Sequence, residues 1–410
     1  MAAAVPNGHA AAAAGEETPP AQASSSSLVF LGTGCSSAVP NARCLIQPPD
    51  PPCPVCSQSL SVPPELNPNY RCNTSLLIDY CHDDGTHKYI IIDVGKTFRE
   101  QVLRWFVRHK IPCVDSIILT HEHADAILGL DDVRVVQPFS PTNDIDPTPI
   151  YLTQFAMDSI SKKFPYLVKK KLKEGEEVRR VAQLDWRVID GDIQKRFTTS
   201  GLEFVPLPVI HGEDYICLGF LFGRKSKVAY ISDVSRFPPT TEYGKSSYPN
   251  AARSVMHMVE WCMCVLFRIK FPVTEEYNFM VQSIFWSKRI SLIFLLDLVD
   301  SFPVLFCLVI TQEPHCYVYT YLSAISKSGG GQLDLLILDC LYRTGSHNVH
   351  LCWDQTLDAV KRICPKRALL IGMTHEMDHH KDNKTLEEWS KREGIDVQLA
   401  CDGLRVYIDL

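Results

Sequence analysis

The sequence predicts an α/β (α+β) fold in which mixed sheets pack on each other and helices cover them. Short apolar runs of strand length recur along the chain, and polar turns join several of them as in hairpins. Segments with helical periodicity separate other runs. Hydrophobic residues make up 46% of the 410 residues, enough for a sizeable core. Because hairpins and helices are mixed, the pattern differs from a purely parallel, doubly wound sheet.

The N-terminal part of the chain contains a tail, a helix and several strands. Residues 1–27 are rich in Ala, Ser and Pro and lack apolar periodicity, so we expect a disordered tail. Residues 96–110 carry apolar side chains at helical spacing, which predicts an amphipathic helix. Apolar runs bounded by Gly or polar turns predict strands at 28–31, 73–80, 88–95 and 115–120.

The C-terminal part continues the same mixture. One predicted strand ends at His211, and the runs 215–223 and 227–234 predict a hairpin across Arg-Lys-Ser-Lys. Further on, a helix at 351–364 separates two buried strands, at 333–341 and 367–375.

Residues 244–323 interrupt this pattern. They are crowded with Phe, Leu, Val, Ile, Cys and Trp, and Gly244 is their only glycine. A transmembrane hairpin would bury Asp297 and Asp300, at high cost. An inserted subdomain is a second interpretation. We favour a third, translated non-coding sequence such as a retained intron, because removing the segment restores a sensible order of elements. The predicted domain therefore comprises residues 28–243 and 324–410.

Charge and cysteine usage narrow the classes of function and location. The net charge of −6 argues against a general nucleic-acid binder. The sixteen cysteines lack the dense spacing of a small secreted scaffold. The first basic residue is Arg43, so neither a secretory signal nor a transit peptide is evident. We expect a cytoplasmic protein that has no membrane partner and is compatible with a homodimer.

The stretch Leu-Thr-His-Glu-His-Ala-Asp predicts metal chemistry. His121, His123 and Asp125 alternate after a buried strand, and this two-residue spacing places their side chains on one face. Imidazole and carboxylate groups are standard ligands for zinc and similar divalent ions. A lone His-x-His is weak evidence, since a solvated loop explains many such pairs.

Three further potential ligands stand at the ends of predicted strands. His211, Asp233 and His375 each follow a mostly apolar run and precede a loop. Any one of them alone is ordinarily a cap or turn residue. Their repetition in one chain predicts that they converge with His121 and His123 on one rim.

These motifs resemble the metallo-β-lactamase superfamily, whose pattern is His-x-His-x-Asp-His. The branch that looks most similar contains the cyclic-phosphate phosphodiesterase of bacterial phosphonate breakdown, PhnP. Phe-Leu-Gly-Thr-Gly near the N-terminus, Asn-Thr-Ser-Leu-Leu-Ile-Asp and Gly-Met-Thr-His-Glu-Met-Asp-His-His all look like that branch. The resemblance implies an αβ/βα sandwich of two packed mixed sheets flanked by helices, with the metal site at one edge.

The resemblance also implies roles for individual residues. His121, His123 and His211 would hold a first metal, Asp233 would bridge, and Asp125 and His375 would bind a second. The sequence departs from the family pattern at Ala126, where the motif has its last His. The site would therefore contain one or two divalent ions, with Zn²⁺ and Mn²⁺ both plausible.

A second, structural zinc site is predicted in the proline-rich loop. Cys53 and Cys56 have the Cys-x-x-Cys spacing of half a tetrahedral site, and Cys44 is a candidate third ligand. In relatives a His shortly after the last catalytic His completes such a site, which points to His379 or His380 here. A redox pair or free thiols are the alternative.

Taken together, these features predict a metal-dependent hydrolase, most simply a phosphodiesterase acting on a small or cyclic phosphate ester. Metal-activated water would attack phosphorus, with Asp125 and His375 as catalytic groups. One alternative is an RNA-processing nuclease like tRNase Z, although we see no inserted basic arm for tRNA. The other is an inactive metal-binding pseudoenzyme, owing to Ala126 and the interruption at 244–323.

Overall fold

The computed structural model describes residues 25–141, 145–168, 181–238, 241, 244–246, 320–322, 325 and 331–410. Its contacts divide the chain into two units, one of residues 1–241 with 332–410 and one of residues 242–331. In the second unit the description covers little more than a two-stranded pair, β11 (Gly244–Ser246) with β12 (Thr320–Leu322). Everything below concerns the first unit.

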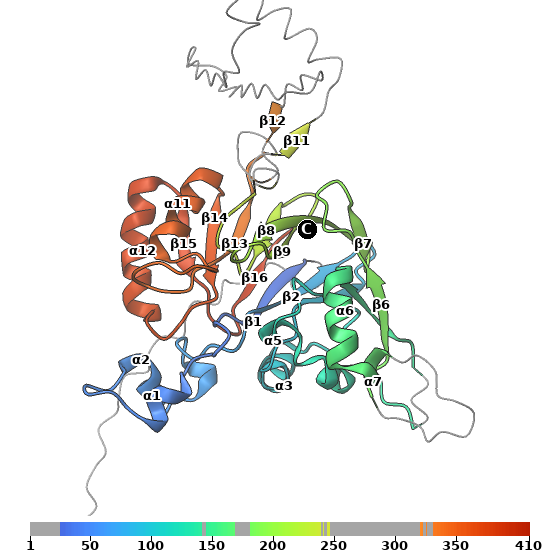
Figure 1. Cartoon of the computed structure of the whole chain (residues 1–410), viewed down its shortest axis with the longest axis horizontal. Coiled ribbons are helices and arrows are strands. Elements are labelled where there is room, and N and C mark those ends of the chain that lie inside the picture. Colours follow the sequence, from blue (N-terminus) through green and yellow to red (C-terminus); the bar gives the residue numbers. More distant parts are fainter. Residues whose placement is uncertain are drawn as a thin grey trace, which may run out of the picture. The chain divides into compact units, whose positions relative to one another are not determined.

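The first unit contains two seven-stranded mixed sheets (Figure 1). In the first sheet β1 to β3 pair antiparallel, and β3 to β6 pair parallel. Its strands, in spatial order, are β16 (Arg405–Tyr407), β1 (Ser27–Gly32), β2 (Ser75–Cys81), β3 (His87–Ile92), β4 (Ser116–Ile118), β5 (Thr148–Leu152) and β6 (Leu184–Val188).

The second sheet likewise has an antiparallel part and a parallel part. β7 to β10 pair antiparallel, whereas β10, β13, β14 and β15 pair parallel. Parallel neighbours need a crossover connection, and the carboxyl ends of these strands meet at one edge of the sheet. In spatial order the strands are β15 (Asp396–Leu399), β14 (Arg367–Ile371), β13 (Leu335–Asp339), β10 (Val228–Ile231), β9 (Ile216–Phe222), β8 (Leu202–Ile210) and β7 (Phe197–Thr199).

The apolar runs of the strands are continuous because many of them are covered on both faces. In β1, Leu28 and Phe30 face the core between the sheets, together with Phe220 of β9 and Ile337 of β13. The alternate residue Val29 faces a separate core beneath the helices of the first sheet. Period-two alternation thus places apolar side chains in both layers of the sandwich.

Helices lie on the outer faces of both sheets (Figure 1). α11 and α12 flank β13, β14 and β15, and α6 and α7 contact β6. The segment 98–109 buries Phe98, Trp105 and Phe106, with a π-helical turn in its middle. The helices are α1 (Ala42–Ile46), α2 (Pro54–Gln58), α3 (Phe98–Gln101), α4 (Val107–His109), α5 (Ala124–Ile127), α6 (Gln154–Lys163), α7 (Pro165–Val168), α11 (Trp353–Ile363) and α12 (His379–Glu393), with a π-helix η2 (Val102–Phe106) and 3₁₀ turns η1 (Pro64–Leu66) and η3 (Leu130–Val136).

The observed architecture confirms the predicted fold class of two packed mixed sheets flanked by helices. The predicted hairpin is β9 with β10, in which Val228 pairs with Phe222. The tail at 1–24 and most of 244–323 lie outside the described residues, so the domain boundaries and the retained-intron interpretation stay predictions. Among the helices that are described, none combines the length and the apolarity that crossing a membrane requires.

Candidate metal centre

Four histidines and one aspartate meet between the two sheets; we call them the imidazole cluster. Its members are His121, His123, His211, Asp233 and His350. Their potential ligand atoms form two groups that share His211, each with all atoms within 4.8 Å of one another. The Nε2 atoms of His121, His211 and His350 each lie 4.0 Å from Oδ1 of Asp233. One carboxylate oxygen therefore stands at the centre of three ring nitrogens.

A chain of hydrogen bonds orients His121, which follows β4. The backbone N–H and the hydroxyl of Thr120 both donate to the buried carboxylate of Asp93, at 2.8 Å. Because the hydroxyl proton is used there, Nδ1 of His121 donates to the hydroxyl oxygen, also at 2.8 Å. The lone pair of Nε2 then points into the cluster, where this buried atom has no hydrogen-bond partner among the described residues. Asp93 thus supports a cluster residue without being a member.

His211 and His350 are oriented in the same way. Nδ1 of His211 donates to the carbonyl oxygen of Val349 at 2.7 Å. Nδ1 of His350 donates to the carboxylate of Asp339, the last residue of β13, at 2.8 Å. An outward hydrogen bond from one ring nitrogen, leaving the other free, is the usual arrangement of a metal-binding histidine.

Electrostatics favour a positive charge at the centre of the cluster. Burial lowers the pKa of His121 to about 3, so its ring is neutral. Burial also acts against ionised Asp233, but the imidazoles around it outweigh that effect and lower its pKa. The partial burial of His350 acts to lower its pKa, yet Asp339 and Asp233 outweigh this and raise it to about 9. The carboxylates thus draw positive charge to this point, and the donor set fits a divalent cation.

Asp125 and Ala126 lie on α5, immediately after His123. Burial and the charge of Asp233 raise the pKa of Asp125, so the two carboxylates are close enough for their charges to interact, although Asp125 belongs to neither of the two groups of potential ligand atoms. Ala126 is buried, with 2% of its surface exposed, and offers no ligand where the motif has a histidine. The part of the cluster beside Asp125 therefore has one nitrogen fewer than the full motif would supply.

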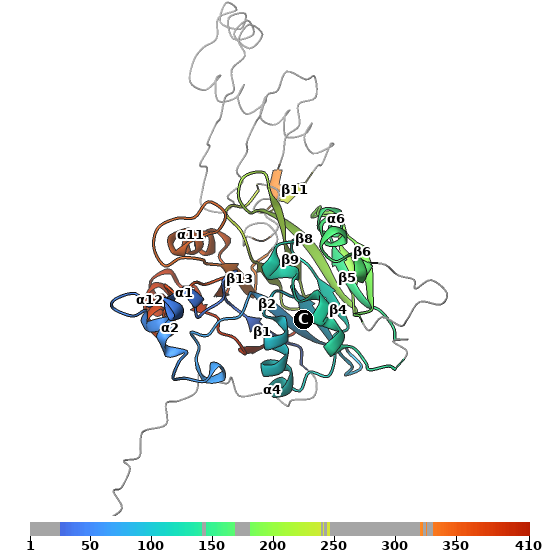
Figure 2. The same ribbon diagram turned by 60° about the horizontal axis from the view of Figure 1, so that its bottom comes forward.

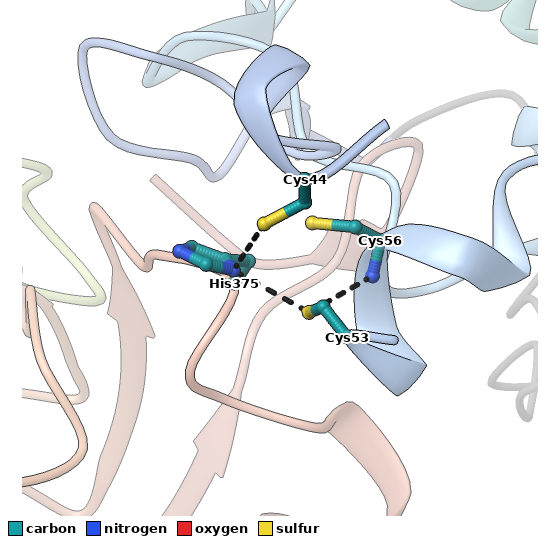
Figure 3. Close-up of side chains that lie close together, drawn as sticks. All are labelled: Cys44, Cys53, Cys56 and His375. Atoms are coloured by element: carbon teal, nitrogen blue, oxygen red, sulfur yellow. Dashed lines mark hydrogen bonds between the residues drawn. The ribbon is translucent and has the colours of Figure 1, made fainter. Parts of the chain in front are cut away.

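Three cysteines and a histidine form a second group, which we call the thiol cluster (Figure 3). Nδ1 of His375 lies 3.5 Å from Sγ of Cys44 and 3.4 Å from Sγ of Cys53. The backbone N–H of Asn41 donates to Sγ of Cys56 at 3.3 Å. One potential ligand atom from each of the four residues lies within 4.8 Å of the others, as a tetrahedral zinc site requires.

The structure corrects the sequence assignment of His375. It was predicted to lie in the catalytic centre, but it lies in the thiol cluster. The reason is that the backbone after β14 runs beside the N-terminal segment and not beside β10. Met373 pairs with Thr33 and Cys35 through backbone hydrogen bonds. Arg71 then donates to the carbonyl oxygens on either side of the turn, those of Thr374 and Met377.

The assignment of His379 to the structural zinc site is also corrected. It begins α12, and its ring nitrogen Nε2 contacts Asn383 at 3.2 Å instead of a thiol. Burial lowers its pKa to about 4. The sequence thus predicted the segment that completes the thiol cluster, but the assigned histidine was the one at the start of α12 and not His375 in the turn before it.

His350 was not predicted as a member of the site. This residue follows no apolar run, because it lies in the polar loop between β13 and α11. The signal that could have found it is the pair His347 and His350 in that loop, directly after a buried strand that ends in Asp339. His121, His123, His211 and Asp233 do come together as expected.

Comparisons with known proteins agree with this architecture. Residues 88–250 match the model of the β-lactamase superfamily domain. The solved structure of a new diphosphatase from the PhnP family aligns with 94% of this chain and 98% of its own, with a TM-score of 0.56 and 24% identity. Zn²⁺-bound PqqB from Methylobacterium extorquens aligns with 93% of this chain and 100% of its own, with a TM-score of 0.52 and 12% identity.

One curated relative matches a part of the chain. An octanoyltransferase of Porphyromonas gingivalis is 30% identical over 207 residues, which are 50% of this chain and 35% of that protein. The chain thus spans about a third of that relative's length, and the transferase activity is a statement about the relative alone. The two-sheet architecture shared with the diphosphatase structure shows that this chain has the metallo-β-lactamase fold, and the match of residues 88–250 to the β-lactamase superfamily domain agrees with it.

Proposed function

We propose that the chain is a metal-dependent hydrolase that cleaves a small phosphate ester, most simply a phosphodiester or cyclic phosphodiester. The observation that carries this proposal is the convergence of three Nε2 atoms on Oδ1 of Asp233, each at 4.0 Å. Because Nδ1 of each ring is hydrogen-bonded outward, the Nε2 atoms of His121, His211 and His350 face this oxygen, and the neutral ring of His121 presents a lone pair there. A divalent cation at this point would balance the carboxylate charge and displace the proton of His350, whose pKa the nearby carboxylates raise to about 9 despite its partial burial.

The residues divide between two adjacent positions. His121, His123 and His211 would hold one divalent ion, with Asp233 shared. His350 and Asp125 would contribute to a second position, which Ala126 leaves short of a ligand. A bound Zn²⁺ or Mn²⁺ would lower the pKa of a water molecule toward 7 and polarise a phosphoryl oxygen.

The chain itself would supply orientation and a proton acceptor. The carboxylate of Asp125, two residues after His123 and near enough to Asp233 for their charges to interact, would orient a water molecule and accept its proton. His350 would take the role in the second position that was predicted for His375. The outward bonds to Thr120, Val349 and Asp339 keep the imidazoles from rotating, so the geometry exists before substrate binds.

Measurement of metal content and turnover together tests this function. We expect purified full-length protein to contain a divalent metal and to hydrolyse bis(p-nitrophenyl) phosphate or a 2′,3′-cyclic nucleotide. His123→Ala should abolish turnover, whereas His380→Ala, an exposed histidine outside both clusters, should not. Bound metal without turnover of any phosphodiester would favour the pseudoenzyme. Cleavage of a tRNA precursor without turnover of small esters would favour the nuclease.

We also propose that the thiol cluster holds a structural zinc ion. Cys44, Cys53, Cys56 and His375 form a Cys₃His set, and the loop that carries the cysteines buries little apolar surface of its own. Cys56→Ser should remove one zinc equivalent and make the 41–66 loop sensitive to proteolysis, because binding energy here is folding energy. Cys113→Ser, outside the cluster, is the matched control. Unchanged zinc content in Cys56→Ser would contradict the assignment.

A further inference from the structure

His123 differs from the other imidazoles of its cluster in how its ring is held. His121, His211 and His350 each make an outward hydrogen bond through Nδ1. No hydrogen bond to the ring of His123 occurs among the described residues, and the residue is exposed. An exposed imidazole without an outer partner keeps its rotational freedom, which a metal ligand must lose on binding.

The ring of Tyr215 contacts His123 instead. The two rings are stacked, with centroids 5.1 Å apart and an interplanar angle of 11°. Tyr215 also approaches the rings of His121 and His211, at 6.4 and 5.8 Å between centroids. Its carbonyl oxygen accepts the backbone N–H of His211 at 2.9 Å. One tyrosine therefore touches all three histidines that would hold the first ion.

Contacts at both ends hold the tyrosine ring. Its hydroxyl donates to the carboxylate of Glu122, the buried residue between His121 and His123. The ring of Phe155 meets it edge-on, with centroids 6.0 Å apart. Lys163 donates to the carbonyl oxygen of Glu122 at 2.7 Å, which fixes the backbone of the His-x-His segment. The plane of Tyr215 is thus set before His123 packs on it.

We propose that Tyr215 is a positioning residue that holds the imidazole of His123 in its metal-binding orientation by stacking, with Glu122 as the anchor of its hydroxyl. The inference rests on the proposed function, since it assumes that the imidazole cluster binds a divalent ion. Tyr215 would contribute no ligand atom. Its role would be to replace the outer hydrogen bond that the other three imidazoles have.

Cobalt titration of the metal-free full chain tests this role. Tyr215→Leu removes the stacked ring and should weaken Co²⁺ binding at the imidazole cluster by about tenfold, the scale of a lost outer partner. It should also change the visible d–d spectrum of that site. Tyr215→Phe keeps the ring and should restore most of the affinity and the spectrum. Thiolate-to-cobalt absorption in the near ultraviolet separates the thiol cluster from this signal.

Controls separate positioning from folding and from the proposed function itself. Tyr166→Leu, a tyrosine of α7, should leave the titration unchanged, and the melting temperature of each metal-free variant reports folding. Cobalt binding that is lost in His123→Ala but unchanged in Tyr215→Leu would overturn the positioning role and leave the hydrolase proposal standing. Absence of cobalt binding by the wild-type imidazole cluster would overturn both.

Discussion

The imidazole cluster and the thiol cluster are built from different kinds of structure. The imidazole cluster draws His121, His211 and Asp233 from residues directly after β4, β8 and β10. In the thiol cluster, Cys44 lies in α1, Cys56 lies in α2 and Cys53 caps α2, each helix being five residues long; only His375 follows a strand. In both views α1 and α2 lie near α12, away from the edge where β8 and β9 lie (Figures 1 and 2).

The two clusters differ in how firmly their side chains are held in position before a metal binds. Outward hydrogen bonds to Thr120, Val349 and Asp339 already orient three imidazoles. In α1 no residue is buried, so little apolar packing holds Cys44 in place. A cluster at strand ends is preorganised by two hydrophobic cores, whereas a cluster on short helices would depend on a bound ion and on a few polar anchors.

Removing the shared carboxylate should have the largest effect. Asp233→Asn keeps a residue that tolerates the left-handed backbone found there, with φ of 48°. It removes the charge among three imidazoles, so we expect phosphodiesterase activity to fall by about 100-fold or more. Metal analysis should show the loss at the imidazole cluster only, with zinc retained by the thiol cluster. Loss at both clusters would contradict their independence.

Removing Arg71, the polar anchor of the thiol cluster, should have the second-largest effect. Arg71 is fully buried and donates to the carbonyl oxygens of Thr374 and Met377 and to the side chain of Asn69. Arg71→Met removes all three hydrogen bonds of a buried guanidinium, although Oδ1 of Asn69 keeps the backbone N–H of His379 as a donor. The loss should cost about 3 kcal/mol of unfolding free energy in urea titrations. Zinc should dissociate faster from the thiol cluster. An Arg71→Met variant as stable as wild type would show that the turn carrying His375 is held otherwise.

Introducing a histidine at Ala126 tests the imidazole cluster and should have the third-largest effect. Ala126→His places an imidazole where the metallo-β-lactamase motif has one and should raise metal content at the imidazole cluster by up to one equivalent. Because Ala126 is buried, overpacking should cost about 1–3 kcal/mol of stability. Ala126→Leu is the control for size. Equal metal content in both variants would show that this position does not face the ions.

The smallest effect is expected on the stability of the fold in acid, through a histidine that lies outside both clusters. Burial, and then the charge of Arg405, lowers the pKa of His109 to about 4, and its ring donates to the carbonyl oxygen of Gly403. Between about pH 6.5 and 4 the unfolded chain therefore binds a proton that the folded chain does not, so stability falls as the pH falls. The difference in unfolding free energy between wild type and His109→Gln should change across this window and stay constant above it.

The fold and most of the imidazole cluster could be predicted from sequence, for one physical reason. A polar ligand directly after a buried apolar run stands at a sheet edge, which is why His121, His211 and Asp233 were found. His350 could not be found by that rule, because its position depends on the loop between β13 and α11. The choice between His375 and His379 depends on Arg71, a tertiary contact that spacing along the chain does not reveal.

The parallel pair β10 and β13 has a consequence for chain length. Val228 to Ile231 align with Leu335 to Leu338, so the chain must leave one end of the sheet and return at the other before pairing. Such a crossover needs about a dozen residues and sets no upper limit, because the entropy of closing a loop grows only slowly with its length. Residues 232–243 and 324–334 alone would satisfy that minimum. The connection between β10 and β13 should therefore tolerate a grafted reporter domain, or a segment that a genomic change adds to the reading frame.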